Sequence, residues 1–215
     1  STVNFIVRSS VHGPVINEVS KEVNRLTDDP VSFWWTYNQA PTTTYDAFYY
    51  LSYCDSIKDA EYAASLIDAP GLNLMYADNE DNIAWWACGK LVNRPEHVHP
   101  LQLLDGITGE DDILGFHDFS KNPKAINPPW GYVYSANNQP DTTNGIFYPG
   151  YYVADHRADR ITELLDQDKK WSVEDMKTMT NDVVSNIHRD LSEEITSLIA
   201  PEVESLNDPL VKDAF

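Results

Sequence analysis

The sequence has few basic residues. Its 215 residues contain 15 Lys and Arg against 34 Asp and Glu, which gives a formal net charge of −19. A protein that binds nucleic acid needs a basic footprint, and an anionic membrane surface attracts basic segments. No apolar run approaches the length of a membrane span. The composition therefore predicts that neither nucleic acid nor a membrane is a partner.

Cysteine is also scarce, with Cys54 and Cys88 as the two thiols. Each lies among aromatic residues, so the default expectation is two buried free thiols. A disulfide stays open as an alternative, because spacing alone cannot show one. Neither cysteine has a base nearby in the sequence, so neither is predicted to be a nucleophile.

Residues that could bind a metal ion are scattered. The pair His97-Val-His99 lacks a third His or a Cys at useful spacing, which argues against zinc. The run Asp78-x-Glu80-x-Asn82 places oxygen ligands at alternate positions. It lacks the Gly and the final Glu of an EF-hand loop. The sequence thus predicts no metal site and no cofactor, and a metal-dependent hydrolase is a weak third hypothesis.

The remaining composition is that of a globular protein, with 42% hydrophobic and 23% charged residues. We predict an α+β fold. Residues 1–150 form a β-rich part with two helices and a long irregular loop, and residues 151–215 form a helical part. Periodicity and turn residues predict strands at 2–8, 15–19, 31–39, 71–78, 82–91 and 130–136, and helices at 43–53, 57–67, 154–165, 172–189 and 190–200.

The most informative stretch is Asn127-Pro-Pro-Trp-Gly-Tyr-Val-Tyr-Ser-Ala-Asn-Asn-Gln-Pro140. Its aromatic and β-branched middle predicts a buried strand that ends at two adjacent carboxamides, Asn137 and Asn138. One interpretation is a turn, because Asn tolerates left-handed backbone. The other is that one amide N–H points into a cleft as an oxyanion donor.

Three further motifs accompany this stretch: His12-Gly-Pro-Val15, Tyr76-Ala-Asp-x-x-x-Asn-Ile83 and His156-Arg-Ala-Asp-Arg-Ile161. In this order the four resemble the β-chain of the penicillin acylase family, which are N-terminal-nucleophile (Ntn) amidohydrolases. The resemblance covers residues 2 to about 200. It implies a partial Ntn-hydrolase-like β-sheet portion with hairpins, followed by a C-terminal helical part.

The resemblance also implies site residues. Asn137 matches the carboxamide that stabilises the oxyanion, and Arg160 matches the arginine that orients it. Trp35 and Leu72 match side chains that line the acyl pocket. From the residues alone, Arg160 could equally form a surface ion pair, and Trp35 could be ordinary core packing. His12, beside Gly-Pro, is expected to be a turn residue rather than a base.

In the resembled family the nucleophile is the N-terminal Ser, Thr or Cys of the β-chain, with its own α-amine as base. A substantial stretch separates it from the His-Gly-Pro motif, whereas His12 lies eleven residues after Ser1. We therefore expect Ser1 not to be the nucleophile. The chain is expected to be a fragment, inert alone, whose partner is the rest of the acylase chain, that is, the α-chain and the N-terminal β segment.

Some members of the resembled family hold a structural calcium ion. One ligand is the carbonyl of a proline at the position of Pro100, and another is an acid. At the matching place this chain has Phe147-Tyr-Pro149 and no acid. We therefore expect no calcium here.

The function implied is hydrolysis of a small-molecule acyl amide, such as a β-lactam side chain or an acyl-homoserine lactone, by a periplasmic or secreted enzyme. Which acyl amide is cleaved cannot be read from the residues. The alternative is a non-catalytic ligand-binding or scaffold module. Its apolar or sugar ligand would lie on an aromatic cluster of Trp34, Trp35, Tyr37, Tyr45, Tyr49 and Tyr50.

Overall fold

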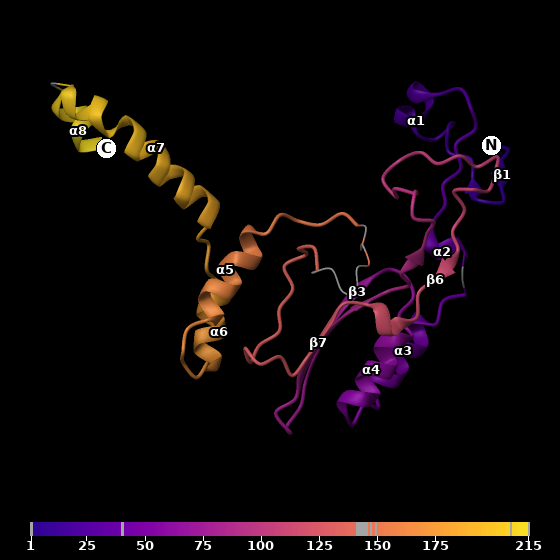
Figure 1. Ribbon diagram of the computed structural model, residues 1–215, viewed down its shortest axis with the longest axis horizontal. Coiled ribbons are helices and arrows are strands. Elements are labelled where there is room, and N and C mark those ends of the chain that lie inside the picture. The colour runs from indigo at the N-terminus through magenta and orange to yellow at the C-terminus, as the bar shows by residue number, and fades with distance from the viewer. Residues whose placement is uncertain are drawn as a thin grey trace. The chain divides into compact units, whose positions relative to one another are not determined.

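A computed structural model describes residues 2–39, 41–140, 146, 148, 150–206 and 208–214. The chain divides into two compact units. The first unit comprises Ser1–Val133 with Pro140–Pro149, and the second comprises Tyr134–Gln139 with Gly150–Phe215. Helices and strands are labelled in Figure 1.

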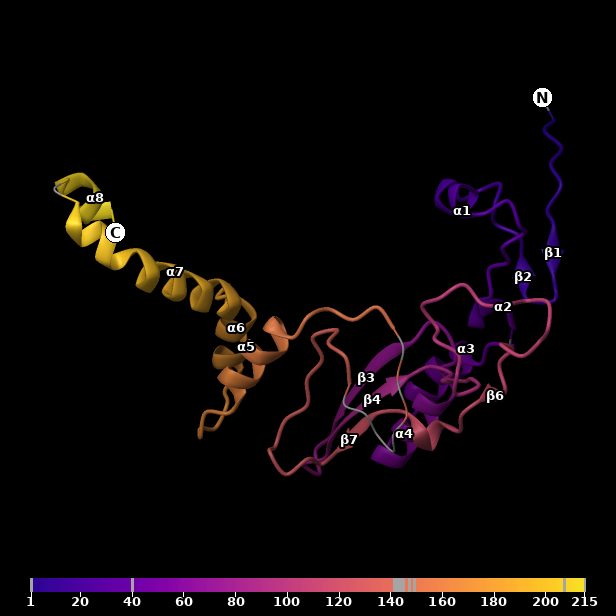
Figure 2. The ribbon, with the colours of Figure 1, turned by 45° about the horizontal axis from the view of Figure 1, so that its top comes forward.

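A three-stranded antiparallel sheet lies at the centre of the first unit. Its strands are β3 (Leu72–Ala77), β4 (Ile83–Cys88) and β7 (Lys124–Ile126), in the order β3-β4-β7. Figure 2 shows them side by side, with α4 close to them. The helices α3 (Thr44–Leu51) and α4 (Ile57–Ser65) pack together, and α4 also packs on β3 and β4. The predicted hairpin and both predicted helices are confirmed.

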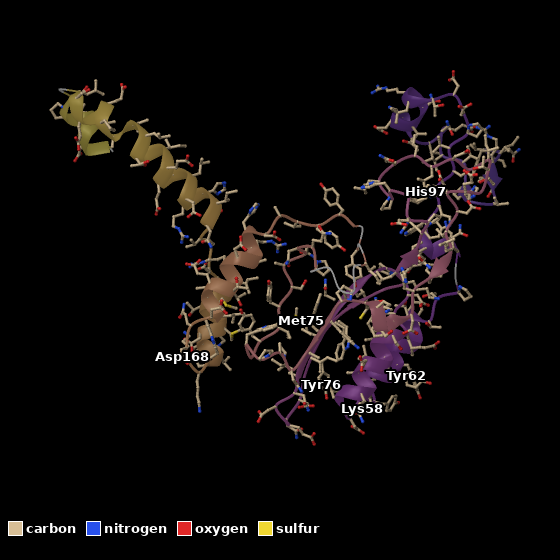
Figure 3. All side chains as sticks on the ribbon, in the orientation of Figure 1. Lys58, Tyr62, Met75, Tyr76, His97 and Asp168 are labelled. Atoms are coloured by element: carbon tan, nitrogen blue, oxygen red, sulfur yellow. The ribbon has the colours of Figure 1, made fainter. Side chains whose placement is uncertain are left out.

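Small residues let the helices approach the sheet closely. The core cluster consists of Ala47, Ala60, Ala64, Ile67, Ala84, Trp86 and Cys88. Alternate residues of β3 pack on this cluster, because successive strand side chains point to opposite faces. The opposite, outer face of α4 carries exposed residues, including Lys58 and Tyr62, which Figure 3 labels. Ser56 caps the start of α4, since its hydroxyl accepts a hydrogen bond from Asp59 N.

The turn between β3 and β4 is organised by Asp78. Its carboxylate accepts hydrogen bonds from the backbone N of Glu80 and of Asn82, each at 2.9 Å, and from the Tyr76 hydroxyl at 2.9 Å. Desolvation and then this bond raise the pKa of Tyr76 to about 12. Desolvation also acts to raise the pKa of Asp78, but the bonds from Asn82, Tyr76 and Glu80 lower it overall. The Asp78 carboxylate thus stabilises the turn of its own hairpin through these hydrogen bonds.

The rest of the first unit consists of short elements. They are β1 (Ser9–Ser10), β2 (Gly13–Pro14), α1 (Lys21–Leu26), α2 (Thr36–Gln39), β5 (Val92–Asn93), β6 (Gly115–Phe116) and a 3₁₀ turn (Phe119–Lys121).

Four predicted strands are wrong. Residues 2–8 and 130–136 contain no strand, residues 15–19 contribute a single bridge from Val15 to Ser32, and residues 36–39 form α2. Trp130 is 59% exposed, and Gly131 adopts a left-handed φ of 82°. A strand persists only where a neighbour takes up its backbone N–H and C=O groups, and a short-range pattern cannot show that neighbour.

The second unit is helical, as predicted. It contains α5 (His156–Leu165), α6 (Val173–Thr180), α7 (Asn186–Ser205) and α8 (Pro209–Ala214). Asp168, labelled in Figure 3, lies in the connection from α5 to α6. Ser172 and Asp175 form a reciprocal capping box at the start of α6.

Three predicted helix boundaries in this unit are wrong. The helix expected to run to Arg189 ends at Thr180, and α7 begins at Asn186. Pro201 lies inside α7 rather than ending it, because the helix tolerates the loss of one backbone donor there. Among the described residues no helix is long and apolar enough to cross a membrane.

Trp86 is the largest fully buried side chain of the core, at 0% exposure. Its indole N–H has no acceptor among the residues that the structure describes. We expect Trp86→Ala to lower the free energy of unfolding by about 3–5 kcal/mol through the cavity that it leaves. Trp86→Phe should cost clearly less, because it keeps a ring and removes an unpaired donor. Urea denaturation of the 215-residue chain measures both, and equal losses would contradict this account.

Candidate active site

Asn137 lies at a sharp corner of the second unit. Its backbone is left-handed, with φ of 59°, a conformation that Asn adopts more readily than most residues. Val153 N donates a 2.8 Å hydrogen bond to its carbonyl, and the preceding residue, Ala136, is 1% exposed. The backbone of Asn137 is therefore held, while its side chain is exposed.

The two adjacent carboxamides are used differently. Asn138 Oδ1 accepts a 3.4 Å hydrogen bond from Ala136 N, a local contact that closes the turn. Asn137 Oδ1 instead accepts a hydrogen bond from an arginine on α5. Asn138 thus makes a local contact, whereas Asn137 combines the left-handed backbone of the turn interpretation with a side chain bonded to α5, and its role as an oxyanion donor stays a prediction.

The arginine that touches Asn137 is Arg157. Its Nη2 donates to Ala136 O at 2.6 Å and to Asn137 Oδ1 at 2.9 Å. Arg157 belongs to the His156–Ile161 motif, whose predicted site residue was Arg160. One sequence feature could have pointed to Arg157: it lies in the first turn of a predicted helix, three residues before Arg160.

Arg160 lies elsewhere in the same unit. Its Nε and Nη2 form a two-pronged contact with Asp182 at 3.1 and 2.7 Å, and its Nη1 lies 2.9 Å from Glu163. The side chain is 19% exposed. This network ties α5 to the segment between α6 and α7. That Arg160 orients Asn137 stays a prediction, since the structure brings Asn137 together with Arg157.

Charge pairing shifts the pKa values within this network. The hydrogen bonds that Arg160 donates to Asp182 and then to Glu163 raise the pKa of Arg160. In return, the hydrogen bond from Arg160 lowers the pKa of both carboxyl groups. All three groups are therefore charged at neutral pH.

The two predicted pocket residues lie in the first unit. Trp35 is 49% exposed, and its ring centroid is 4.9 Å from that of Tyr37 and 6.2 Å from that of Phe33. Leu72 pairs with Cys88 across β3 and β4 and packs against the core cluster. Their roles in an acyl pocket stay predictions.

The aromatic residues of the alternative hypothesis form more than one group. Trp35 and Tyr37 stack with Phe33, whereas Tyr49 and Tyr50 contact each other on α3 at 5.6 Å. The second group continues to Tyr53 and Tyr62. Exposed rings in these groups can contact a ligand or a protein surface, so the arrangement does not separate the two hypotheses.

Two histidines pair with two adjacent acids, Asp111 and Asp112. His12 Nε2 lies 2.7 Å from Asp112 Oδ1, and His97 Nε2 lies 3.0 Å from Asp111 Oδ1. Figure 3 labels His97. The hydrogen bond from the Asp105 backbone, and then that from His97, lowers the pKa of Asp111. These contacts connect His12 and His97 to the segment that contains Asp111 and Asp112, so both histidines have a structural role.

Neither the cysteines nor the acids form an obvious reactive centre. Cys54 and Cys88 are both free thiols, but only Cys88 is buried as predicted, and Cys54 is partly exposed. Burial raises the pKa of Cys88 to about 11. Among the described residues no group of three or more His, Cys, Asp and Glu could hold a metal ion. The prediction about calcium depends in part on Phe147 and Pro149, which lie outside the described residues.

Comparison with known proteins identifies the family. A sequence profile described as Penicillin amidase matches residues 1–212. The chain belongs to the penicillin amidase family. The resemblance that the four motifs carried is thereby confirmed.

Curated relatives of this penicillin amidase chain are acyl-homoserine lactone acylases named QuiP. The Pseudomonas aeruginosa protein is 28% identical over 196 residues, which cover 85% of this chain and 22% of that protein. The Pseudomonas fluorescens protein is 31% identical over 128 residues, which cover 59% of this chain and 16% of that protein. The chain thus spans about a fifth of the length of these relatives.

The fold also matches a solved structure. A thermostable penicillin G acylase from Alcaligenes faecalis superposes with a TM-score of 0.65 at 23% identity. The match covers 80% of this chain and 30% of that one. It supports the α+β fold class with small antiparallel sheets and a helical part.

The Arg160 network predicts an acid-sensitive second unit. Because Asp182 and Glu163 have lowered pKa values in the folded state, their contribution is present above their unfolded values of 3.8 and 4.5. It is lost as pH falls through the folded values. We expect Asp182→Asn to lower the melting temperature at pH 7 and to flatten its decline below about pH 4.

The matched control is Glu174→Gln, which removes an exposed carboxylate paired with Lys177 on α6. Its melting temperature should follow that of the unmodified chain across the same pH range. An Asp182→Asn curve parallel to the unmodified one would contradict the role given to this network.

Proposed function

We propose that this chain carries the oxyanion-stabilising part of an amidohydrolase active site, with Asn137 Nδ2 as the donor. One observation supports the proposal: Asn137 Oδ1 accepts a hydrogen bond from Arg157, so the amide N–H₂ is directed away from that guanidinium. Among the described residues no acceptor is bonded to that nitrogen. A donor held in place without a protein acceptor is what a transient oxyanion requires.

The proposed reaction splits an amide in two steps. An N-terminal Ser, Thr or Cys, supplied from outside these 215 residues, attacks the amide carbonyl while its α-amine takes the proton. The carbonyl oxygen becomes negative, and Asn137 Nδ2–H donates to it. The C–N bond then breaks, the proton passes to the leaving amine, and water releases the acyl group by the same route.

The proposed substrate is an acylated small molecule. The curated relatives are named acyl-homoserine lactone acylases, and the structural relative is named a penicillin G acylase. Both names fit cleavage between an acyl group and an amine. Within this proposal, Trp35 and Leu72 contact the acyl chain, because both present apolar surface.

The proposed partner is the rest of the acylase, namely the α-chain and the N-terminal β segment. The extent of the match supports this, since the chain covers 22% of the QuiP protein and 30% of the penicillin G acylase chain. A periplasmic or secreted location, maturation from a zymogen and quorum quenching belong to the same proposal. The location and the maturation are supported by the family resemblance alone.

Asn137→Ala in the full-length protein tests the donor. Removing one oxyanion donor costs about 10²–10³ in kcat, so we expect a loss in that range with little change in KM. Asn138→Ala is the matched control, because it removes a neighbouring carboxamide that closes the turn. Release of a chromogenic amine from an acyl anilide measures both. Equal activity of Asn137→Ala and the unmodified protein would refute the proposal.

The 215-residue chain alone should be inert. It is expected to release no amine from the same acyl anilide, because the attacking group is supplied from elsewhere. The purified chain is compared with a preparation of Asn137→Ala, which controls for contaminating acylase. Turnover that Asn137→Ala abolishes would contradict this expectation.

A further inference from the structure

Helix α7 carries an exposed apolar stripe along its length. Five apolar side chains recur at helical spacing and are called the α7 stripe here: Ile187, Leu191, Ile195, Leu198 and Ile199. Their exposed fractions lie between 44% and 70%, and α7 contains no buried residue among those that the structure describes. Figures 1 and 2 show α7 extending beyond α5 and α6, with α8 at its far end. A continuous apolar stripe of this kind marks an interaction surface.

Local interactions do not explain why α7 is a helix. Its N-cap, Ser185, makes no side-chain capping bond, its first turn has no acid, and its last turn has no base. The last turn instead carries Glu202 and Glu204, which the negative end of the helix dipole disfavours. Pro201 removes a backbone donor from the interior. Because isolated helices are marginal in water even with favourable sequences, α7 needs packing against its apolar face.

The second unit supplies only part of that packing. Helix α7 packs against α5 and α8. Its contacts with α5 are polar at the start of the helix, where Asn186 Nδ2 donates to Glu163 at 2.9 Å and Arg189 Nη1 lies 3.7 Å from Glu163. These contacts fix the first turn of α7 and leave the stripe exposed. A cover for the stripe therefore has to come from outside the residues that the structure describes.

Acidic residues beside the stripe limit what can cover it. Glu194 lies three residues after Leu191 and four before Leu198, so it borders the stripe. Glu202 lies one turn after Leu198. Both carboxylates are on exposed residues, and neither forms an ion pair with another described residue. The complementary surface thus has basic groups beside an apolar face.

Charge also argues against two other occupants. An anionic lipid surface attracts basic segments and would be repelled by these acids. A second copy of the chain would bring the same acids, and a second net charge of −19, against the first. The matched relatives offer a third occupant, since the matches cover 22% of the QuiP protein and 30% of the penicillin G acylase chain. Most of an acylase of that length lies outside these 215 residues.

We infer that the α7 stripe is a docking surface for another segment of the acylase polypeptide, an amphipathic segment whose apolar face is bordered by Lys or Arg. The inference rests on the proposed function, because it takes the rest of the acylase as the partner. It goes beyond that proposal by naming the surface that docks and the chemistry of the segment that covers it.

Thiol labelling of the full-length protein tests the docking surface. Leu191→Cys and Ile195→Cys each place a thiol in the stripe, and Glu193→Cys places one on the other side of the same helix. A thiol under packed protein reacts only when that contact opens, so we expect both stripe thiols to react with a maleimide on the order of 10-fold more slowly than Glu193→Cys. The unmodified protein gives the background from Cys54 and Cys88.

Two results would overturn the inference. Stripe thiols that react as fast as Glu193→Cys would show that nothing covers the stripe. Protection that disappears when the full-length protein is diluted would assign the cover to a second copy. Because two separate positions are tested, a variant that fails to fold leaves the other to decide.

The charge of the covering segment is tested by Glu194→Lys in the full-length protein. A base beside the proposed Lys or Arg is repelled, so the melting temperature should fall by about 1–3 °C, and by more at low salt. Glu193→Lys is the matched control, since it makes the same charge change on the other side of α7 and should leave the melting temperature nearly unchanged. Equal effects of the two substitutions would overturn the basic border.

The labelling result is independent of turnover, which separates this inference from the proposed reaction. Protected stripe thiols together with a fully active Asn137→Ala variant would refute the proposed oxyanion donor and leave the docking surface standing. Unprotected stripe thiols together with an impaired Asn137→Ala variant would leave the donor standing and overturn the docking surface.

Discussion

The hydrogen bonds from Arg157 to Ala136 O and Asn137 Oδ1 are the interaction on which the candidate site depends. Without a donor at that place, an exposed carboxamide is free to rotate, and its oxygen and nitrogen can exchange positions. With the guanidinium there, only one orientation makes a favourable contact. The left-handed backbone of Asn137 is thereby combined with a side chain whose oxygen is held by Arg157.

Helix α5 connects this site to the stability of the second unit. Arg157 in its first turn meets the corner at Asn137, and Arg160 one turn later binds Asp182 and Glu163. The second arginine fastens the helix to the segment before α7, which keeps the first arginine in register. Arg157 thus contacts the corner at Asn137, whereas Arg160 contacts Asp182 and Glu163.

The first unit is stabilised mainly by apolar packing rather than by ion pairs. Its order comes from small side chains of α4 packed on alternate residues of a three-stranded sheet, with Trp86 filling the centre. Asp78 closes the central hairpin with hydrogen bonds to its own turn. The segments around this core are short strands and turns, held by pairs such as His12 with Asp112.

Local chemistry in the sequence determined the hairpin, helices α3 and α4, the caps at Ser56 and Ser172, and the family through four ordered motifs. These features depend on neighbours within a few residues, which the sequence displays. Only the tertiary structure decided that residues 130–136 are not a strand, because a strand needs a partner that no local pattern names. It also decided that Arg157 rather than Arg160 meets Asn137. Both arginines have helical spacing, and which one reaches the amide depends on how the corner at Asn137 packs against the start of α5.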